Sequence, residues 1–174
     1  MLKMRFNRGD RDVLSKIYEK YKNDMLKLAN SLLHDTNSAE DVLNDSFVSL
    51  AHSLGKLHLR GNLKSYLVAC VLNHSRNFYR ASLRKKEISI AEAMNEKTDL
   101  NYPQRTAILH EEYKRLENAM AQIPNEQREI IVLHLQSEIK FREIAKLMNI
   151  SVNTAKSRYR YGLSKLHTLL DNEV

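Results

Sequence analysis

Apolar residues recur every three or four positions through most of the chain, which is the spacing of amphipathic α-helices. The pattern is clearest over residues 10–33, where its members are Leu14, Ile17, Tyr21, Met25, Leu28 and Leu32. A second helix is predicted to start at an N-cap formed by Ser38, with Asp41 in the capping-box position, and to end near residue 54. A third helix is predicted over residues 63–84, with Leu67, Val71, His74 and Phe78 facing the core.

The second half of the chain has a sharper pattern. Helices are predicted over residues 107–122, from Pro124 onward, over residues 141–148 and over residues 152–170. Asn149 tolerates the left-handed conformation of a tight turn, and Ser151 can cap the last helix. Val152 begins the apolar stripe that is expected to keep this last helix packed. A short helix, a tight turn and a long basic helix are the layout of a helix-turn-helix.

Between these two blocks, residues 87–106 lose the periodicity, turn polar and contain Pro103. The sequence therefore predicts an all-α fold of two small helical domains joined by a flexible linker. The predicted boundaries are a three-helix-type domain over residues 1–86, the linker over residues 87–106 and a helix-turn-helix domain over residues 107–174. A content of only 4 Gly and 2 Pro argues against a turn-rich all-β fold.

Several classes of chemistry lack a sequence signature. Cys70 is the only cysteine, which excludes an intrachain disulfide and cysteine-rich zinc sites. The chain has no glycine-rich phosphate loop and no His-Glu-x-x-His pair, and its histidines are scattered. We therefore predict a protein that is not an enzyme, with no catalytic residue, metal site, cofactor or small-molecule substrate. Because no signal peptide and no run of about 20 apolar residues occurs, a cytoplasmic chain without membrane insertion is expected.

The net charge of +7 is unevenly distributed along the chain. No acid lies between Asp45 and Glu87, a stretch that holds Lys56, Arg60, Lys64, Arg76, Arg80, Arg84, Lys85 and Lys86. A field of one sign over this length attracts a polyanion. A solvated basic surface is the plainer explanation, but such surfaces usually interleave both signs. Nucleic acid is therefore the favoured partner, ahead of a membrane surface.

Two helices carry polar faces that suit nucleic acid. On the third helix, one stripe contains Asn73, Arg76, Asn77, Arg80 and Arg84, and Tyr66 extends it with a ring on which a base can stack. On the last helix, the candidates are Asn153, Thr154, Lys156, Ser157, Arg158 and Arg160. Of these, Lys156, Ser157 and Arg160 are expected to reach a groove floor, and Thr154 and Arg158 to contact backbone phosphate. An ordinary solvated surface is the alternative for each face.

The second helix carries a different stripe, formed by Asp41, Asn44, Asp45 and Val48 and lying opposite Leu43 and Phe47. An acidic stripe within a basic half suits a positively charged protein partner. Acids that complement the helix dipole explain Asp41 well, but they explain Asp45, more than a turn further in, less well. On composition alone the two interpretations are even.

Six motifs occur in a fixed order along the chain. They are Tyr18-Glu-Lys-Tyr21, Ala-Glu-Asp-Val-Leu-Asn-Asp-Ser-Phe over residues 39–47, Leu59-Arg-Gly61, Ile-Pro-Asn-Glu-Gln-Arg over residues 123–128, Phe-Arg-Glu-Ile-Ala over residues 141–145 and Ile-Ser-Val-Asn-Thr-Ala-Lys-Ser-Arg over residues 150–158. Together they resemble the motifs of bacterial sigma factors of the extracytoplasmic-function (ECF) type. The chain departs from the usual family residues at Asn44 (usually Gln), Tyr66 (Trp), Leu72 (Arg), Tyr161 (Arg) and Gly162 (Ala).

The resemblance implies an RNA polymerase sigma factor that recognises the minus-ten and minus-thirty-five promoter elements and promotes DNA melting. It assigns binding of core RNA polymerase to Asp41, Asn44, Asp45, Phe47 and Val48. It assigns minus-ten DNA to the loop over residues 59–65, with Arg60 and Lys64, and to the helix with Tyr66, Asn73 and Asn77. The last helix corresponds to the reader of the minus-thirty-five element, and an anti-sigma factor is a further candidate partner. The alternative is a stand-alone helix-turn-helix regulator, which explains residues 141–170 but leaves the first ninety without a stated role.

Overall fold

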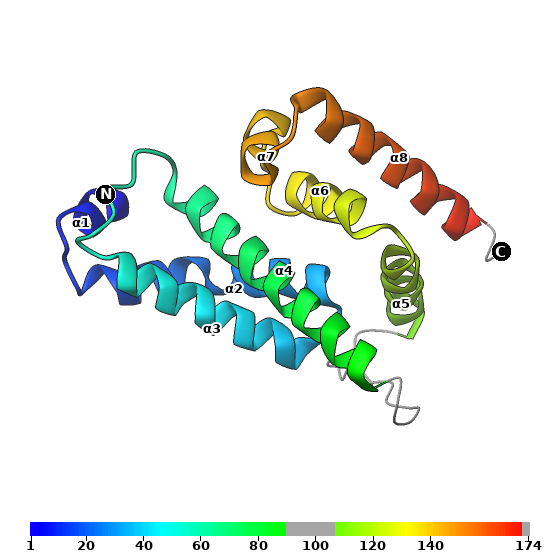
Figure 1. The fold of residues 1–174 in the computed structure, drawn as a ribbon, viewed down its shortest axis with the longest axis horizontal. Helices are drawn as coiled ribbons and strands as arrows, with labels where there is room; N and C mark the ends of the chain where they lie inside the picture. Colours follow the sequence, from blue (N-terminus) through cyan, green and yellow to red (C-terminus); the bar gives the residue numbers. More distant parts are fainter. Residues whose placement is uncertain (90–106, 172–174) are drawn as a thin grey trace. The chain divides into compact units, whose positions relative to one another are not determined.

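The computed structural model describes residues 1–89 and 107–171 (Figure 1). Every regular element in that part of the chain is an α-helix, which confirms the prediction of an all-α fold. The helices are α1 (Leu2–Asn7), α2 (Val13–Leu33), α3 (Thr36–Ser53), α4 (Leu63–Ser89), α5 (Ala107–Ala121), α6 (Asn125–Leu135), α7 (Phe141–Met148) and α8 (Val152–Asp171). The chain separates into two compact units, Met1–Thr98 and Asp99–Val174.

In the first unit, α2, α3 and α4 pack against one another and α1 packs against α2. Their shared core contains Ile17, Leu28, Leu50, Leu67 and Val68, and none of these side chains is exposed to solvent. Burying an aliphatic side chain of this size stabilises a fold by about 1.5–3 kcal/mol. The three long helices therefore form the predicted three-helix arrangement, to which the structure adds one short helix.

The short helix α1 is absent from the sequence prediction because 6 residues are too few to show helical periodicity. Phe6 anchors α1 to the bundle, and its side chain is fully buried. The predicted first helix starts at Asp10, whereas α2 begins at Val13, because residues 8–12 turn the chain from one helix into the next.

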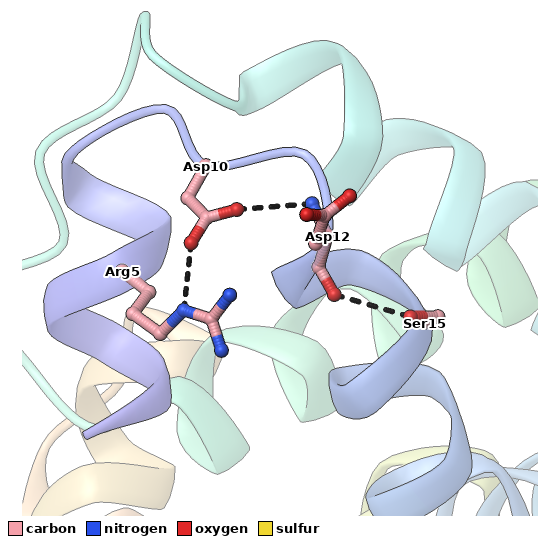
Figure 2. A network of polar contacts seen from close by, with 4 residues as sticks. All are labelled: Arg5, Asp10, Asp12 and Ser15. Carbon is pink, nitrogen blue, oxygen red and sulfur yellow. Dashed lines mark hydrogen bonds and ion pairs between the residues drawn. The ribbon is translucent and has the colours of Figure 1, made fainter.

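A polar network holds this turn (Figure 2). Arg5 Nε donates to Asp10 Oδ2 at 2.6 Å, and the backbone N–H of Asp12 donates to Asp10 Oδ1 at 3.0 Å. Ser15 Oγ then donates to the carbonyl oxygen of Asp12 at 3.1 Å. The hydrogen bond from Arg5 lowers the pKa of the Asp10 carboxyl and raises the pKa of the Arg5 guanidinium. The end of α1 and the start of α2 are therefore fixed to each other through Asp10.

The cap of α3 differs from the prediction. Its N-cap is Asp35, whose carboxylate accepts the backbone N–H of Ser38 at 2.9 Å and also bonds the Ser38 hydroxyl. Ser38 is therefore a buried residue of the first turn, and Asp41 does not occupy a capping-box position. Four residues that favour N-caps stand in a row here, Asp35 to Ser38, so the residue types alone do not indicate which of them caps the helix.

The helix α4 continues to Ser89, three residues into the predicted linker, whose remaining residues 90–106 lie outside the described ranges. Leu67 and Val71 face the core as predicted, but Phe78 does not, because 40% of it is exposed. Residues 77–81 are all exposed, and five consecutive residues cover every side of a helix. This part of α4 therefore extends beyond the cover of α2 and α3, and an apolar side chain there has no core to face.

In the second unit, α8 packs against α5, α6 and α7. The turn between α7 and α8 has the predicted form, since Asn149 adopts φ 53° and ψ 48°, the left-handed conformation. Ser151 caps α8 as predicted by accepting the backbone N–H of Thr154 at 3.0 Å. Val152, predicted to pack, is 36% exposed because it is the first residue of α8. Pro124 stands at the N-cap of α6, one position before the predicted first turn.

The helices α6 and α8 approach each other closely at Gly162, which is buried. A Cβ atom at this position would lie 2.8 Å from Ile131 Cδ1 and 3.1 Å from Gln127 Cβ. Both distances are shorter than ordinary van der Waals contact, so Ile131 fills the space that a side chain on residue 162 would need.

Candidate nucleic-acid and protein interfaces

The polar stripe of α4 lies on the outside of the first unit. Asn73, Asn77, Arg80 and Arg84 are exposed, and Arg76 is half-buried. The backbone periodicity of the helix brings these side chains to one side, as the sequence predicts. The stripe contains no acid, and its exposed members present amide and guanidinium donors to an anionic ligand.

Tyr66, at the beginning of α4, is half-buried and hydrogen-bonded to α3. Its hydroxyl lies 3.0 Å from Ser53 Oγ. Burial raises the pKa of the Tyr66 phenol, so the group stays neutral at physiological pH. The ring is thus held against α3 instead of standing free, and only part of it is accessible for stacking with a base.

The basic loop between α3 and α4 is held in place by contacts with other helices of the unit. Arg60 is exposed, whereas Leu59 is only 7% exposed. The Leu59 carbonyl accepts a hydrogen bond from the Asn7 side chain of α1, and the Leu59 N–H donates one to it. Lys64, predicted to contact DNA, forms an ion pair with Asp24 of α2 at 3.8 Å. Because the pair is long and partly exposed, the Lys64 ammonium can exchange Asp24 for a phosphate at little cost.

A hollow of about 610 Å³ opens beside this loop. Its lining residues are Met1, Leu2, Lys3, Lys20, Tyr21, Arg60, Gly61, Asn62 and Leu63. Three of these residues are cationic, namely Lys3, Lys20 and Arg60. Sequence reasoning found Arg60 but missed Lys3 and Lys20, because neither belongs to the third helix or its loop and only the tertiary fold brings them to it.

The acidic stripe of α3 is exposed as predicted at Asp41, Asn44 and Asp45, and Val48 is 53% exposed. Within the described ranges neither Asp41 nor Asp45 forms an ion pair, although the surrounding unit is basic. Two carboxylates that the fold leaves unneutralised remain available to a positively charged partner.

An apolar hollow of about 290 Å³ is lined by residues of α2 and α3, namely Leu14, Ser15, Tyr18, Glu19, Phe47 and Leu50. Phe47 is half-buried and packs edge-on against the ring of Tyr18, with 4.9 Å between centroids. Phe47 therefore links the acidic stripe to an apolar depression. The contribution of Leu14 and Tyr18 was not predicted, because the apolar stripe of α2 appears in sequence only as core.

On α8, the predicted groove-facing side chains Lys156 and Arg160 are exposed, as is Asn153, and Ser157 is half-buried. Thr154 is also half-buried, and its hydroxyl lies 2.8 Å from Ser151 Oγ. Arg158 departs from the simple expectation, because its guanidinium forms an ion pair with Glu126 of α6. On the basic face of α8, Arg158 is therefore engaged in an ion pair, and the guanidinium of Arg160 lies over the ring of Tyr161 at 5.5 Å from its centroid.

The described ranges hold no cluster of three His, Cys, Asp or Glu side chains that could bind a metal ion. The imidazole of His134 serves packing: its Nδ1 lies 2.9 Å from the carbonyl oxygen of Ile139, and its ring stacks on Phe141 at 4.1 Å. None of the helices in those ranges is long and apolar enough to cross a lipid bilayer.

The second unit thus has the geometry of a helix-turn-helix DNA-binding protein, and the first adds a second basic face and an acidic one. Comparison with known families makes this class specific. Residues 17–85 match the family model of sigma-70 region 2, and residues 113–166 match the model of sigma-70 region 4.

Curated relatives agree with both matches. The chain is 28% identical over 140 residues to the ECF RNA polymerase sigma factor EcfG of Rhodopseudomonas palustris, covering 80% of this chain and 75% of that one. It is 27% identical over 163 residues to the ECF sigma factor SigM of Bacillus subtilis, covering 92% and 97%. This chain belongs to the ECF family of RNA polymerase sigma factors.

Two solved structures share the fold. CnrH, solved with the cytosolic domain of CnrY, superposes with a TM-score of 0.75 at 21% identity, covering 99% of this chain and 97% of that one. The sigma factor RpoE of Bartonella quintana, solved with the anti-sigma factor NepR, gives a TM-score of 0.71 at 20% identity, covering 90% and 97%.

Proposed function

We propose that this sigma factor binds core RNA polymerase through α3 and contacts promoter DNA through α4, the preceding loop and α8. The observation that carries the proposal is the separation of charge within the first unit. Apart from the half-buried Arg76, the α4 stripe is exposed, and it contains no acid, whereas Asp41 and Asp45 on α3 are exposed and form no ion pair in the described structure. The first unit therefore offers one surface to a polyanion and a second surface to a basic protein.

The polymerase-binding surface consists of Asp41, Asn44, Asp45, Phe47 and Val48. The carboxylates would steer and orient a basic helix of core RNA polymerase. Val48 and the apolar hollow beside Phe47 would bury apolar side chains of the same partner, since charge pairs at an interface set orientation more than affinity. The combination explains why an apolar residue stands exposed within an acidic stripe.

The minus-ten surface consists of the loop with Arg60 and of the α4 residues Lys64, Tyr66, Asn73, Arg76, Asn77, Arg80 and Arg84. Opening a duplex there requires unstacking of bases, which costs a few kcal/mol per flipped base. Stacking and polar contacts with the single strand would offset this cost. Exposed amides on α4 can form hydrogen bonds to base edges, and the exposed arginines can contact phosphates.

The minus-thirty-five surface consists of the α8 residues Asn153, Thr154, Lys156, Ser157, Arg158 and Arg160. A helix of this kind enters the major groove with its amino-terminal half against base edges. Lys156 and Arg160 are exposed and one turn apart, so both can reach the same groove. Arg158 can reach phosphate only after it leaves Glu126.

Three further parts of the proposal follow from family membership. The chain would perform no catalysis itself, since the reaction belongs to the polymerase. It would act in the cytoplasm, where the polymerase and the promoter are. An anti-sigma factor would control it, because both related structures described above are complexes with a second protein, NepR being an anti-sigma factor.

Run-off transcription with purified core RNA polymerase tests the proposal. Adding this chain to core enzyme and fragmented genomic DNA of the source should produce transcripts that begin at defined promoters. The absence of any transcript that depends on the added chain would refute the proposal. A gel-shift assay completes the test: tight, sequence-specific binding to duplex DNA by the chain without polymerase would instead favour a stand-alone regulator.

A further inference from the structure

The short helix α1 holds the loop between α3 and α4 by polar contacts that the family motifs do not include. Asn7 Nδ2 donates to the carbonyl oxygen of Leu59 at 3.1 Å, and the backbone N–H of Leu59 donates to Asn7 Oδ1 at 2.9 Å. One side-chain amide therefore satisfies both backbone groups of a residue 52 positions away. Lys3 Nζ donates to the carbonyl oxygen of the next residue, Arg60, at 3.0 Å.

Both hydrogen bonds to Leu59 are needed because this residue is nearly buried, at 7% exposure. A buried backbone group that loses its partner costs about 1–3 kcal/mol. Leu59 lies between α3 and α4, outside both helices, so the Asn7 amide supplies the hydrogen bonds that its backbone groups would otherwise find within a helix. These two hydrogen bonds, which we call the Asn7 bracket, thus determine where Leu59 and the adjacent Arg60 can lie.

The other end of the loop is held by backbone packing against the end of α1. Gly9 and Gly55 both have positive φ, +75° and +70°. A Cβ atom built on either one would lie 3.7–3.8 Å from the Cα atom of the other, so the two glycines face each other closely. The helix is itself fixed to the bundle by the buried Phe6 and by the ion pair between Arg5 and Asp10. Hence α1 and the turn after it contact the loop at its start, at Gly55, and again at Leu59 and Arg60.

We propose that Asn7 is a positioning residue for promoter opening, which it serves by pre-forming the loop of residues 55–62. The inference rests on the proposed function of that loop as a holder of single-stranded minus-ten DNA. A loop that becomes ordered only on binding loses about 1–2 kcal/mol of backbone entropy per residue, and a pre-formed loop avoids this loss. Lys3 contributes in the same place, because its ammonium lines the cationic hollow with Lys20 and Arg60 and also fixes the Arg60 carbonyl.

The test compares Asn7→Ala with Met4→Ala. Met4 is on the same helix, is 59% exposed and takes no part in the bracket, so it controls for a change in α1 itself. In Asn7→Ala, hydrogen exchange of the Leu59 amide should accelerate by about tenfold, the size expected for loss of one buried hydrogen bond. Asn7→Asp keeps the acceptor for the Leu59 N–H but loses the donor to its carbonyl, so its amide should exchange more slowly than in Asn7→Ala.

The functional readout is promoter opening by the holoenzyme, followed by 2-aminopurine fluorescence in the minus-ten element. Asn7→Ala should open DNA several-fold more slowly than Met4→Ala at a temperature where both variants are folded, while affinity for core polymerase matches that of the control. If Leu59 exchange and DNA opening match the control, the inference is wrong. A parallel loss of core binding would also overturn it, since it would show a general structural role. If instead the unaltered chain opens no promoter, the proposed function itself fails, whatever the exchange data show.

Discussion

The guanidinium of Arg158 on α8 forms an ion pair with the carboxylate of Glu126 on α6. The two side chains are 28% and 67% exposed, so water and salt screen their attraction. Pairs of this kind contribute at most about 1 kcal/mol to stability. The pair is therefore a weak restraint on a residue that we propose contacts DNA, and Glu126 competes with phosphate for Arg158.

Replacing Glu126 with glutamine should raise the affinity of the holoenzyme for a minus-thirty-five duplex by about twofold to fivefold, the equivalent of breaking an exposed pair. The reason is that Arg158 no longer has to leave a carboxylate to reach a phosphate. Fluorescence anisotropy of a labelled duplex measures the effect. The matched control adds Arg158→Ala to Glu126→Gln, which should remove the gain. A lower affinity in Glu126→Gln would contradict the competition between Glu126 and DNA.

Asp45→Arg should weaken binding to core RNA polymerase by about tenfold or more, because it places a like charge against the basic partner. The circular dichroism spectrum should not change, since Asp45 is exposed and forms no ion pair in the described structure. Glu112→Arg is the control, because this exposed acid lies on α5 in the other unit and makes the same change of charge. Equal binding by both variants in a pull-down with core polymerase would place the docking surface elsewhere.

Arg80→Ala and Asn73→Ala should both weaken binding of the holoenzyme to single-stranded minus-ten DNA, but with different salt dependence. Arg80 carries charge, so its loss should reduce the slope of log K against log salt by about 0.7 for each phosphate contact removed. Asn73 is neutral, and its loss should leave the slope unchanged. Lys27→Ala, an exposed cation on α2, is the control. Identical slopes for Arg80→Ala and the control would argue against phosphate contact by Arg80.

Because Asp10 forms an ion pair with Arg5, we expect the stability of the fold to depend on pH. Its pKa in the folded chain lies below the ordinary value of 3.8, so the unfolded chain binds the proton first as the pH falls. The stabilisation from the ion pair is therefore complete above the pKa of the Asp10 carboxyl in the unfolded chain. It is lost as the pH falls below that value and through the lower pKa of the folded chain. Between about pH 6 and pH 3, thermal unfolding of the wild type should lose more stability than that of Asp10→Asn.

Asp12→Asn is the control for this experiment, because Asp12 forms hydrogen bonds in the network only through its backbone N–H and carbonyl, and its carboxylate has the smallest of the effects on the pKa of Arg5. It should keep the acid sensitivity of the wild type. If Asp10→Asn and the wild type lose stability in parallel, the ion pair with Arg5 does not stabilise the fold in solution.

The fold was accessible from sequence wherever a long amphipathic pattern exists. The periods of α2, α3 and α8 span several turns, and the Asn149 turn has a residue that tolerates left-handed backbone. The short helix α1 was not accessible, since its role comes from Phe6 and Asn7 meeting partners that are distant in the chain. Phe78 was placed wrongly because periodicity indicates which face is apolar but not where the neighbouring helices end.

For the candidate surfaces, too, sequence predicts what a single helix determines but not what depends on neighbouring helices. Exposure of Asp45, Asn73 and Arg80 follows from helical geometry, which a single helix determines. The engagement of Arg158 by Glu126 and of Lys64 by Asp24 depends on which helices become neighbours. Sequence spacing carries no information on such pairs, so residues of similar type look equivalent in sequence and differ in the structure.

Because Gly162 and Ile131 lie close together, the size of the side chain that fits at one position depends on the residue at the other. An alanine in place of Gly162 would bring its methyl group too close to the Ile131 side chain, whose Cδ1 atom would have to move. A larger residue at position 162 therefore requires either that the Ile131 side chain moves or that residue 131 becomes shorter. The effects of substitutions at the two positions on stability should therefore not be additive.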